Sequence, residues 1–213
     1  MNRALERFPG DARLELEHAM AAAARFSVTT DGGRYAPDFG SQVIVVTGGR
    51  ISMPSQQTRL PQRETAIALL YALRDDPVVG AEASVRLGYL LWALGQDDAA
   101  TASLVQGAAA AKDADIEYLA RFLLGWTALL GGDADAAVPH LRAALDARPG
   151  SQSAAVALGA LELQRGDAAA AYTIAQTSLD TRAADDDPWR LFLYGHHSHL
   201  SSLVASLRKR VKP

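Results

Sequence analysis

Three histidines stand close together near the C-terminal end of the sequence, as His196, His197 and His199. Imidazole nitrogens bind metal ions such as zinc, and two histidines three residues apart lie on the same face of a helix. His196 and His199 have this spacing. The nearest acidic group, Asp185–Asp187, is better explained as the cap of a helix. The two histidines are therefore weak metal-ligand candidates, and a solvated turn between helices is the favoured interpretation.

Other residues that could do chemistry are missing or scattered. The sequence contains no cysteine, which excludes disulfides, thiol nucleophiles and thiolate metal sites. It lacks the glycine-rich loops that bind phosphates or dinucleotides, the serine motif of hydrolases and the histidine motif of zinc proteases. Its carboxylates are spread over expected helix surfaces and single out no acid–base pair. We therefore expect a protein that is not an enzyme and needs no cofactor. An enzymatic or metal-binding role is the least favoured class.

Composition and charge restrict the possible partners. The chain has 213 residues, 49% of them hydrophobic, and a formal net charge of −3. This charge offers no basic surface for nucleic acid. No stretch approaches the ~20 apolar residues that cross a bilayer, so no membrane insertion is expected. The N-terminal residues are charged and amphipathic, unlike a signal peptide. The cytoplasm is the favoured location, although the sequence does not fix the compartment.

Pairs of leucine and glycine recur along the middle of the chain. Their glycines are Gly88, Gly125 and Gly159, which are 37 and 34 residues apart. A second glycine follows each of them seven residues later, at Gly95, Gly132 and Gly166. A glycine inside a helix costs about 1 kcal/mol relative to alanine, and close approach of a second helix is the usual reason to keep it. The second glycine ends that helix in the left-handed conformation, and aspartates after it cap the next helix.

The most complete unit is Tyr118–Pro149, within residues 115–149. Its regularly spaced small and apolar residues are Leu124, Gly125, Gly132, Ala137, Leu141, Ala144 and Pro149. In type and spacing they resemble a tetratricopeptide repeat (TPR). Residues 81–112 and 152–183 match more loosely, and Ser84, Arg121 and Ala155 replace the family's early aromatic residue. The resemblance implies an all-α solenoid of antiparallel helix pairs that binds other proteins.

The N-terminal region fits one more unit, split by an insertion. Residues 1–25 contain its first helix and residues 62–77 its second, aligned on Pro77. The intervening residues 26–61 are rich in Gly, Ser, Thr and Pro, and Ser41–Thr47 is β-prone. We therefore expect a loop with a short hairpin or edge strand. A loop this long is either functional or disordered, and its hydrophobic run Val43–Val46 is expected to pack on other residues. A lid on the outside of its own repeat is favoured over a ligand-recognition loop.

The C-terminal segment, residues 187–213, is predicted to form two capping helices. Asp187 suits the N-cap position and Pro188 the first helical position. A second amphipathic helix is expected at about Ser198–Val211. Repeat arrays need end helices to cover the last apolar face. The prediction is therefore a solenoid of about four repeats that ends in this pair.

The concave side of such a solenoid is lined by the first helix of each repeat. The side chains on the free face of these helices are predicted to form a partner-binding groove, made of Val85, Arg86, Tyr89, Trp92, Leu119, Phe122, Leu123, Trp126, Leu129 and Val156. An aromatic surface of this size is rarely left exposed without a use. Only Arg86 fits the basic residues with which TPR proteins grip a terminal carboxylate. The leading hypothesis is an adaptor or scaffold whose groove binds an apolar or amphipathic segment of another protein.

Two alternatives to an open groove remain. The insertion 26–61 could fold into the groove as an internal ligand. The aromatic residues could instead be core, in a structural subunit or spacer of a larger assembly. The sequence identifies neither the partner nor the oligomeric state.

Overall fold

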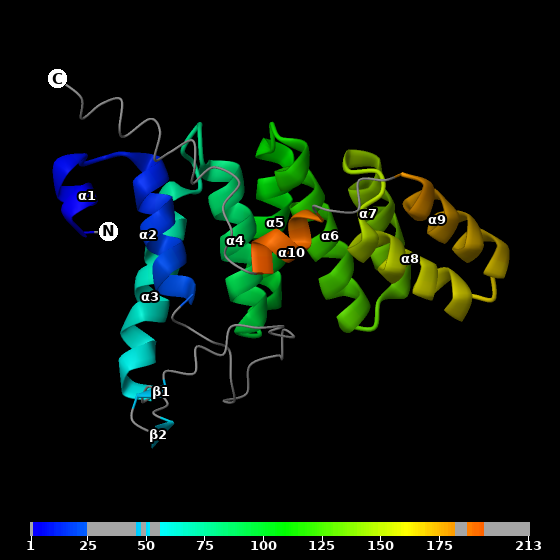
Figure 1. Ribbon diagram of the computed structural model, residues 1–213, viewed down its shortest axis with the longest axis horizontal. Coiled ribbons are helices and arrows are strands. Elements are labelled where there is room, and N and C mark those ends of the chain that lie inside the picture. The colour runs from blue at the N-terminus through cyan, green and yellow to red at the C-terminus, as the bar shows by residue number, and fades with distance from the viewer. Residues whose placement is uncertain (1, 25–45, 48–49, 52–55, 182–186, 194–213) are drawn as a thin grey trace.

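A computed structural model describes residues 2–24, 46–47, 50–51, 56–181 and 187–193 (Figure 1). The prediction of an all-α protein is confirmed. The described helices are α1 (Asn2–Arg7), α2 (Ala12–Ala24), α3 (Gln56–Leu73), α4 (Gly80–Ala93), α5 (Asp97–Ala110), α6 (Ala114–Leu130), α7 (Ala134–Ala147), α8 (Gln152–Gln164), α9 (Ala168–Asp180) and α10 (Pro188–Leu193). In the described part of the chain, each helix is too short or too polar to cross a lipid bilayer.

The helices α2 to α9 form an elongated row of neighbouring pairs. Helix α2 contacts α3, α4 contacts α5, α6 contacts α7, and α8 contacts α9, while the second helix of each pair also contacts the next pair. Figure 1 shows the pairs side by side from α2 to α9. Helices α4 and α6 also contact each other directly. They therefore share one side of the row, and this side carries the candidate site.

Two of the mid-helix glycines allow close approach between the helices of a pair. A Cβ atom added to Gly88 would lie 2.6 Å from Cγ of Leu104, and one added to Gly125 would lie 2.7 Å from Cγ of Leu141. Both distances are shorter than any tolerated carbon–carbon contact, so the leucine side chain or the helix that carries it would have to shift. Gly159 differs, because the nearest atom to an added Cβ is a backbone oxygen at 4.0 Å. The steric reason for the glycine therefore holds in two of the three pairs.

The turns within three pairs are built alike. The glycines that end α4, α6 and α8 have positive φ angles, at Gly95 (75°), Gly132 (84°) and Gly166 (83°). Asp133 accepts a hydrogen bond from the backbone N–H of Ala136 at 2.9 Å, and Asp167 accepts one from Ala170 at 2.8 Å. Glycine adopts a positive φ without strain, and the aspartate satisfies a free donor at the start of the next helix. These two residue types set the short connections between α6 and α7 and between α8 and α9.

The N-terminal pair joins helices that are far apart in sequence. Apolar side chains of α2 and α3, including Leu16, Met20 and Leu70, share one buried cluster. Between these helices, β1 (Val46–Thr47) pairs antiparallel with β2 (Arg50–Ile51). The rest of the predicted insertion, up to residue 55, lies outside the described residues.

The predicted start of α3 was wrong. The prediction placed this helix at residues 62–77, by alignment with the best repeat from Pro77, and assigned residues up to 61 to the insertion. The observed helix begins at Gln56, continues through Pro61 and ends at Leu73. Pro61 lacks one backbone donor, so the helix gives up a single hydrogen bond and continues.

The described part of the predicted C-terminal cap lies elsewhere than expected. Helix α10 packs against α4 and α6 (Figure 1), because its two aromatic side chains contact aromatic rings of those helices. The α8–α9 end of the row keeps large apolar side chains exposed, namely Val156, Leu163, Tyr172 and Leu179. The second predicted capping helix, at 198–211, lies outside the described residues. Helix α10 is thus a segment folded back along the row.

Candidate functional site

Aromatic rings of α4 and α6 surround α10. The ring centroid of Tyr89 lies 5.9 Å from that of Trp189 and 5.5 Å from that of Phe192, both edge-on. The centroid of Phe122 lies 5.1 Å from that of Trp189. Within α10, the rings of Trp189 and Phe192 stack at 5.7 Å. Residues three apart share a helix face, so α10 presents both rings to the same surface.

We call this surface the α4–α6 face, and define it by Arg86, Tyr89, Tyr118, Phe122 and Trp126. The rings of Tyr118, Phe122 and Trp126 follow each other along α6, with centroid separations of 5.8 Å and 6.0 Å. Their spacing of four residues places them on one side of the helix. The α4–α6 face is therefore a continuous aromatic platform.

Arg86 adds a positive charge to the α4–α6 face. Its guanidinium carbon lies 4.7 Å from the centroid of the Phe192 ring. The Nε and Nη2 atoms of Arg86 donate hydrogen bonds to Oε1 of Glu82 at 2.9 Å and 2.7 Å. This ion pair, one helical turn long, fixes the direction of the guanidinium group. A cation above an aromatic ring contributes about 0.5–2 kcal/mol, depending on how far water is excluded.

A buried carboxylate anchors the start of α10. The Asp187 side chain is only 3% exposed. Its Oδ1 accepts a hydrogen bond from the Tyr118 hydroxyl at 2.9 Å and one from the Trp189 backbone N–H at 3.0 Å. Its Oδ2 accepts one from the backbone N–H of Ser153 at 2.8 Å. Asp187 therefore caps α10 and also lies at the N-terminus of α8, where the helix dipole favours a negative charge.

The environment keeps the Tyr118 hydroxyl a hydrogen-bond donor. Burial raises the pKa of Tyr118 far above its usual value, and the negative charge of Asp187 raises it further. Both effects disfavour the phenolate form. Tyr118 is fully buried, so its hydroxyl stays protonated across the neutral pH range. The Tyr118–Asp187 hydrogen bond then links α6 to α10 across 69 positions of the chain.

The structure brings four of the predicted groove residues together. Arg86, Tyr89, Phe122 and Trp126 belong to the α4–α6 face, and the first three contact α10. Trp126 is half-buried and stacks on Phe122. Two of these residues lie on α4 and two on α6, and the direct contact between the two helices brings them together.

The other predicted groove residues lie elsewhere. Most of them are fully or partly buried in the core, namely Val85, Trp92, Leu119, Leu123 and Leu129. Val85 points toward α5, where a Cβ atom added to Gly107 would be 2.8 Å from the Val85 Cγ2 atom. Val156 lies on α8 and is 71% exposed. The α4–α6 face is therefore smaller than the predicted groove.

Several residues that form the contact between α10 and the α4–α6 face were not assigned to the site from the sequence. The additional residues are Tyr118, Ser153, Asp187, Trp189 and Phe192. One signal was available, because Asp187 and Pro188 predicted a helix start and two aromatic residues follow at helical spacing. The position of that helix depends on contacts between distant parts of the chain, and no local pattern encodes them.

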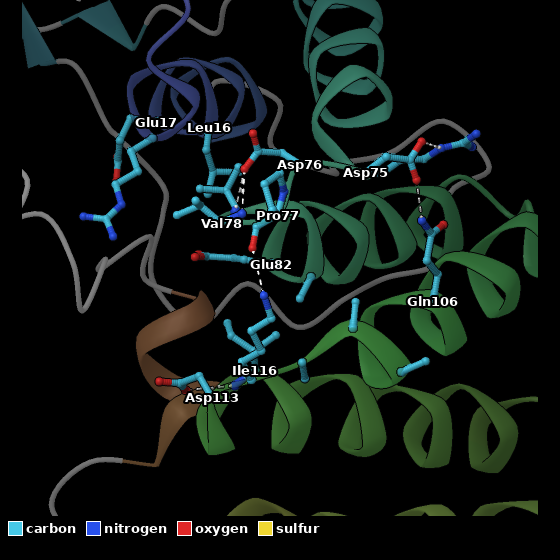
Figure 2. Close-up of a pocket in the computed structure, with 18 residues that line it drawn as sticks. Leu16, Glu17, Asp75, Asp76, Pro77, Val78, Glu82, Gln106, Asp113 and Ile116 are labelled. Atoms are coloured by element: carbon cyan, nitrogen blue, oxygen red, sulfur yellow. Dashed lines mark hydrogen bonds and ion pairs between the residues drawn. The ribbon is translucent and has the colours of Figure 1, made fainter.

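A cavity of about 650 Å³ adjoins this region, between α2, the α3–α4 turn and the neighbouring ends of α5 and α6 (Figure 2). Asp76 accepts hydrogen bonds from the backbone N–H groups of Val78 and Val79 at 2.8 Å and 3.0 Å. Lys112 donates to the carbonyl of Pro77 at 3.3 Å. Asp76 therefore orders the turn before α4, and Lys112 links this turn to the segment between α5 and α6.

Glu17 connects the cavity with the α4–α6 face. Burial raises the pKa of Glu17, while the positive charge of Arg86 lowers it and the negative charge of Glu82 raises it. Both carboxylates line the cavity in Figure 2. Arg86 thus interacts with carboxylates on one side and with the Phe192 ring on the other.

The candidate metal ligands His196 and His199 lie outside the described residues. Within the described ranges, no three histidine, aspartate or glutamate side chains lie close enough to hold a metal ion. No protein-family model matches the chain, and no curated protein matches it in sequence. The chemistry of the α4–α6 face is therefore the basis for a functional proposal.

Proposed function

We propose that this protein is a non-catalytic interaction module, an adaptor or scaffold of the TPR kind, which binds a short helical segment of another protein on its α4–α6 face. One observation carries the proposal: that face already holds a short helix. Helix α10 has six residues. Helices this short are unstable in water without tertiary contacts, so the α4–α6 face supplies the stabilisation.

The packing of the row supports a TPR-like solenoid. Gly88 and Gly125 allow close approach within a pair, and glycines with positive φ end the first helices. The resemblance of Tyr118–Pro149 to the family rests on the same positions. In a solenoid of this kind α4 and α6 are first helices and line the concave side, where such arrays bind their ligands.

The chemistry of the α4–α6 face suits helix recognition. Aromatic anchors in a desolvated centre supply most of the affinity of protein interfaces, and arginine is enriched there. Tyr89, Phe122 and Trp126 supply the rings, and Arg86 supplies the cation. An amphipathic helix binds such a surface through residues three or four apart. The contacts of Trp189 and Phe192 have this pattern.

A structural role is the second candidate, and the position of α10 is the observation that favours it. Phe122, Tyr118 and Phe192 are buried together in one cluster, as expected for a permanent core. In this case the protein is a subunit or spacer whose concave side is filled by its own chain. Within the described part of the chain, the filling segment is α10. Most of the insertion 26–61, which the sequence suggested for this place, lies outside the described residues.

Capture of partners from the native host tests the proposal. A photo-reactive amino acid at position 126 of the full chain should crosslink a partner, and the same probe at exposed Tyr172 on α9 serves as the control. Trp126→Ala should abolish capture of that partner, with an unchanged circular dichroism spectrum, whereas Tyr172→Ala should retain it. Equal capture by both variants, or no crosslink from position 126, would leave the structural role as the better account.

A further inference from the structure

We infer that α10 is an internal copy of the ligand. The segment that the α4–α6 face takes from a partner is a short helix whose N-cap carries a carboxylate, with aromatic residues two and five positions later. Helix α10 competes with this segment. The inference rests on the proposed function and extends it to the chemistry of the ligand and the regulation of the site.

The carboxylate requirement comes from two hydrogen-bond donors that lie outside α10. The Tyr118 hydroxyl belongs to α6 and the Ser153 backbone N–H belongs to the start of α8. Both donate to the Asp187 carboxylate, at 2.9 Å and 2.8 Å. They stay in place when α10 leaves, and they form a fixed receptor for one anionic group. A ligand without a carboxylate there would bury these donors without an acceptor, which is costly.

The aromatic requirement comes from the positions of Trp189 and Phe192. Trp189 lies between Tyr89 and Phe122, and Phe192 lies between Tyr89 and the Arg86 guanidinium. An aromatic residue at the second position therefore gains stacking, and one at the fifth gains a cation–π contact. An aliphatic residue fills the same space without either interaction. The face thus selects a carboxylate followed by two rings at fixed spacing.

Competition follows from the tether between α9 and α10. Residues 182–186 join the two helices, so α10 stays close to its own face. A covalent connection as short as this one gives an effective concentration on the order of millimolar. A second copy of the chain would first have to release its own α10 from its own face, whereas the segment of a partner would not, which favours a partner over exchange between copies. The partner's apparent affinity is lowered by the fraction of molecules in which α10 occupies the face.

Peptide binding to the full chain tests the inference. The probe is a fluorescent peptide with the sequence of Asp185–Tyr194. The double variant Trp189→Ala, Phe192→Ala removes both rings from α10 and frees the face. The peptide should bind this variant at least about tenfold more tightly than it binds the wild-type chain. If the double variant unfolds, Asp187→Asn in the full chain replaces it, since this change weakens α10 and keeps both rings.

Two matched peptides test whether the ligand needs a carboxylate at its N-cap. A peptide with the change Asp187→Asn should bind the freed chain about tenfold or more weakly, because a charge-assisted hydrogen bond is lost. Adding Tyr118→Phe to the protein should reduce this difference between the peptides. Equal binding of the two peptides would overturn the carboxylate requirement. Equal binding of the wild-type and freed chains would overturn the competition.

The remaining outcomes separate the inference from the proposed function. A freed chain that crosslinks a host partner through position 126 but does not bind the acidic aromatic peptide refutes the inference alone. Failure of both experiments refutes the proposed function as well. A stable dimer by light scattering that is lost in the double variant would make a second copy the occupant, and would overturn the assignment to a partner.

Discussion

Replacing Tyr118 by phenylalanine removes one oxygen atom from the contact between α6 and α10. The hydroxyl donates to Oδ1 of Asp187 at 2.9 Å, and both side chains are buried. The ring would remain, stacked on Phe122 at 5.8 Å. The substitution therefore removes this hydrogen bond, together with the hydrogen bonds of the hydroxyl with Ser151 and Ala154, with little change in packing. The double-mutant cycle with Asp187 isolates the part that belongs to the Tyr118–Asp187 bond.

The expected loss follows from the charge of the acceptor. A hydrogen bond to a charged group contributes about 1.5–3 kcal/mol, and a buried carboxylate that loses one of its donors is destabilised further. Asp187 keeps the donors Trp189 and Ser153, so the carboxylate stays partly satisfied. The loss appears first in the docking of α10, since this six-residue helix can leave the face without unfolding the row. We expect α10 docking to weaken by about 1.5–3 kcal/mol.

Hydrogen exchange measured by mass spectrometry reports the free energy with which α10 docks on the α4–α6 face. The amides of α10 should exchange at least about tenfold faster in the Tyr118→Phe variant, whereas the amides of α7 should change little. Tyr172→Phe on α9 is the matched control, because Tyr172 is 70% exposed. A double-mutant cycle with Asp187→Asn should give a coupling of about 1 kcal/mol or more. Unchanged exchange in α10, or additive effects in the cycle, would refute the assignment of this bond as the anchor.

The remaining predictions concern packing and pH. Gly125→Ala should lower the free energy of unfolding in urea by about 1–3 kcal/mol, because the added Cβ would lie 2.7 Å from Leu141 Cγ. Gly159→Ala should leave this free energy unchanged or raise it by up to about 1 kcal/mol, because the nearest atom to its added Cβ is 4.0 Å away. Glu17→Gln should stabilise the protein at neutral pH and lose this advantage near pH 4.5, since burial raises the pKa of Glu17 above 4.5 and the folded state favours its protonated form. His140→Gln should flatten the fall in stability below pH 6.5, because burial and then the charge of Arg121 lower the pKa of His140, and the wild-type chain loses stability as the imidazole is protonated. A larger loss for Gly159→Ala than for Gly125→Ala, or pH profiles unchanged by the other two substitutions, would contradict these explanations.

The helix pairs could be predicted because their signals are local. Glycines such as Gly132 adopt positive φ, and Asp133 caps the following helix within three residues. Turn chemistry of this kind is encoded in a few adjacent residues. The start of α3 was missed because the alignment from Pro77 fixed only the end of this helix, and the composition of residues 26–61 gave no sign that the helix begins at Gln56 and continues through Pro61.

The site could be predicted only in part. Tyr89 and Phe122 were predicted to line a partner-binding groove, and in the structure both rings contact α10. Val85 was assigned to the same side, but it packs on Gly107 of α5, since a helix in a row is covered on more than one side. The partnership of Tyr118 with Asp187 spans 69 positions and has no local signature. Only the folded chain shows that α10 is the segment held on the α4–α6 face.

The most direct test of the central claim is to locate a bound helix on the freed chain. The full chain with Trp189→Ala and Phe192→Ala would carry a photo-reactive amino acid at position 126 on α6, next to the Phe122 ring that contacts Trp189 of α10, or, as a control, at position 172 on α9. The account predicts that the Asp185–Tyr194 peptide crosslinks from position 126 and not from position 172. Crosslinking from position 172 alone, or no saturable binding to a variant that is folded, would contradict the claim that the α4–α6 face is a receptor for a short helix.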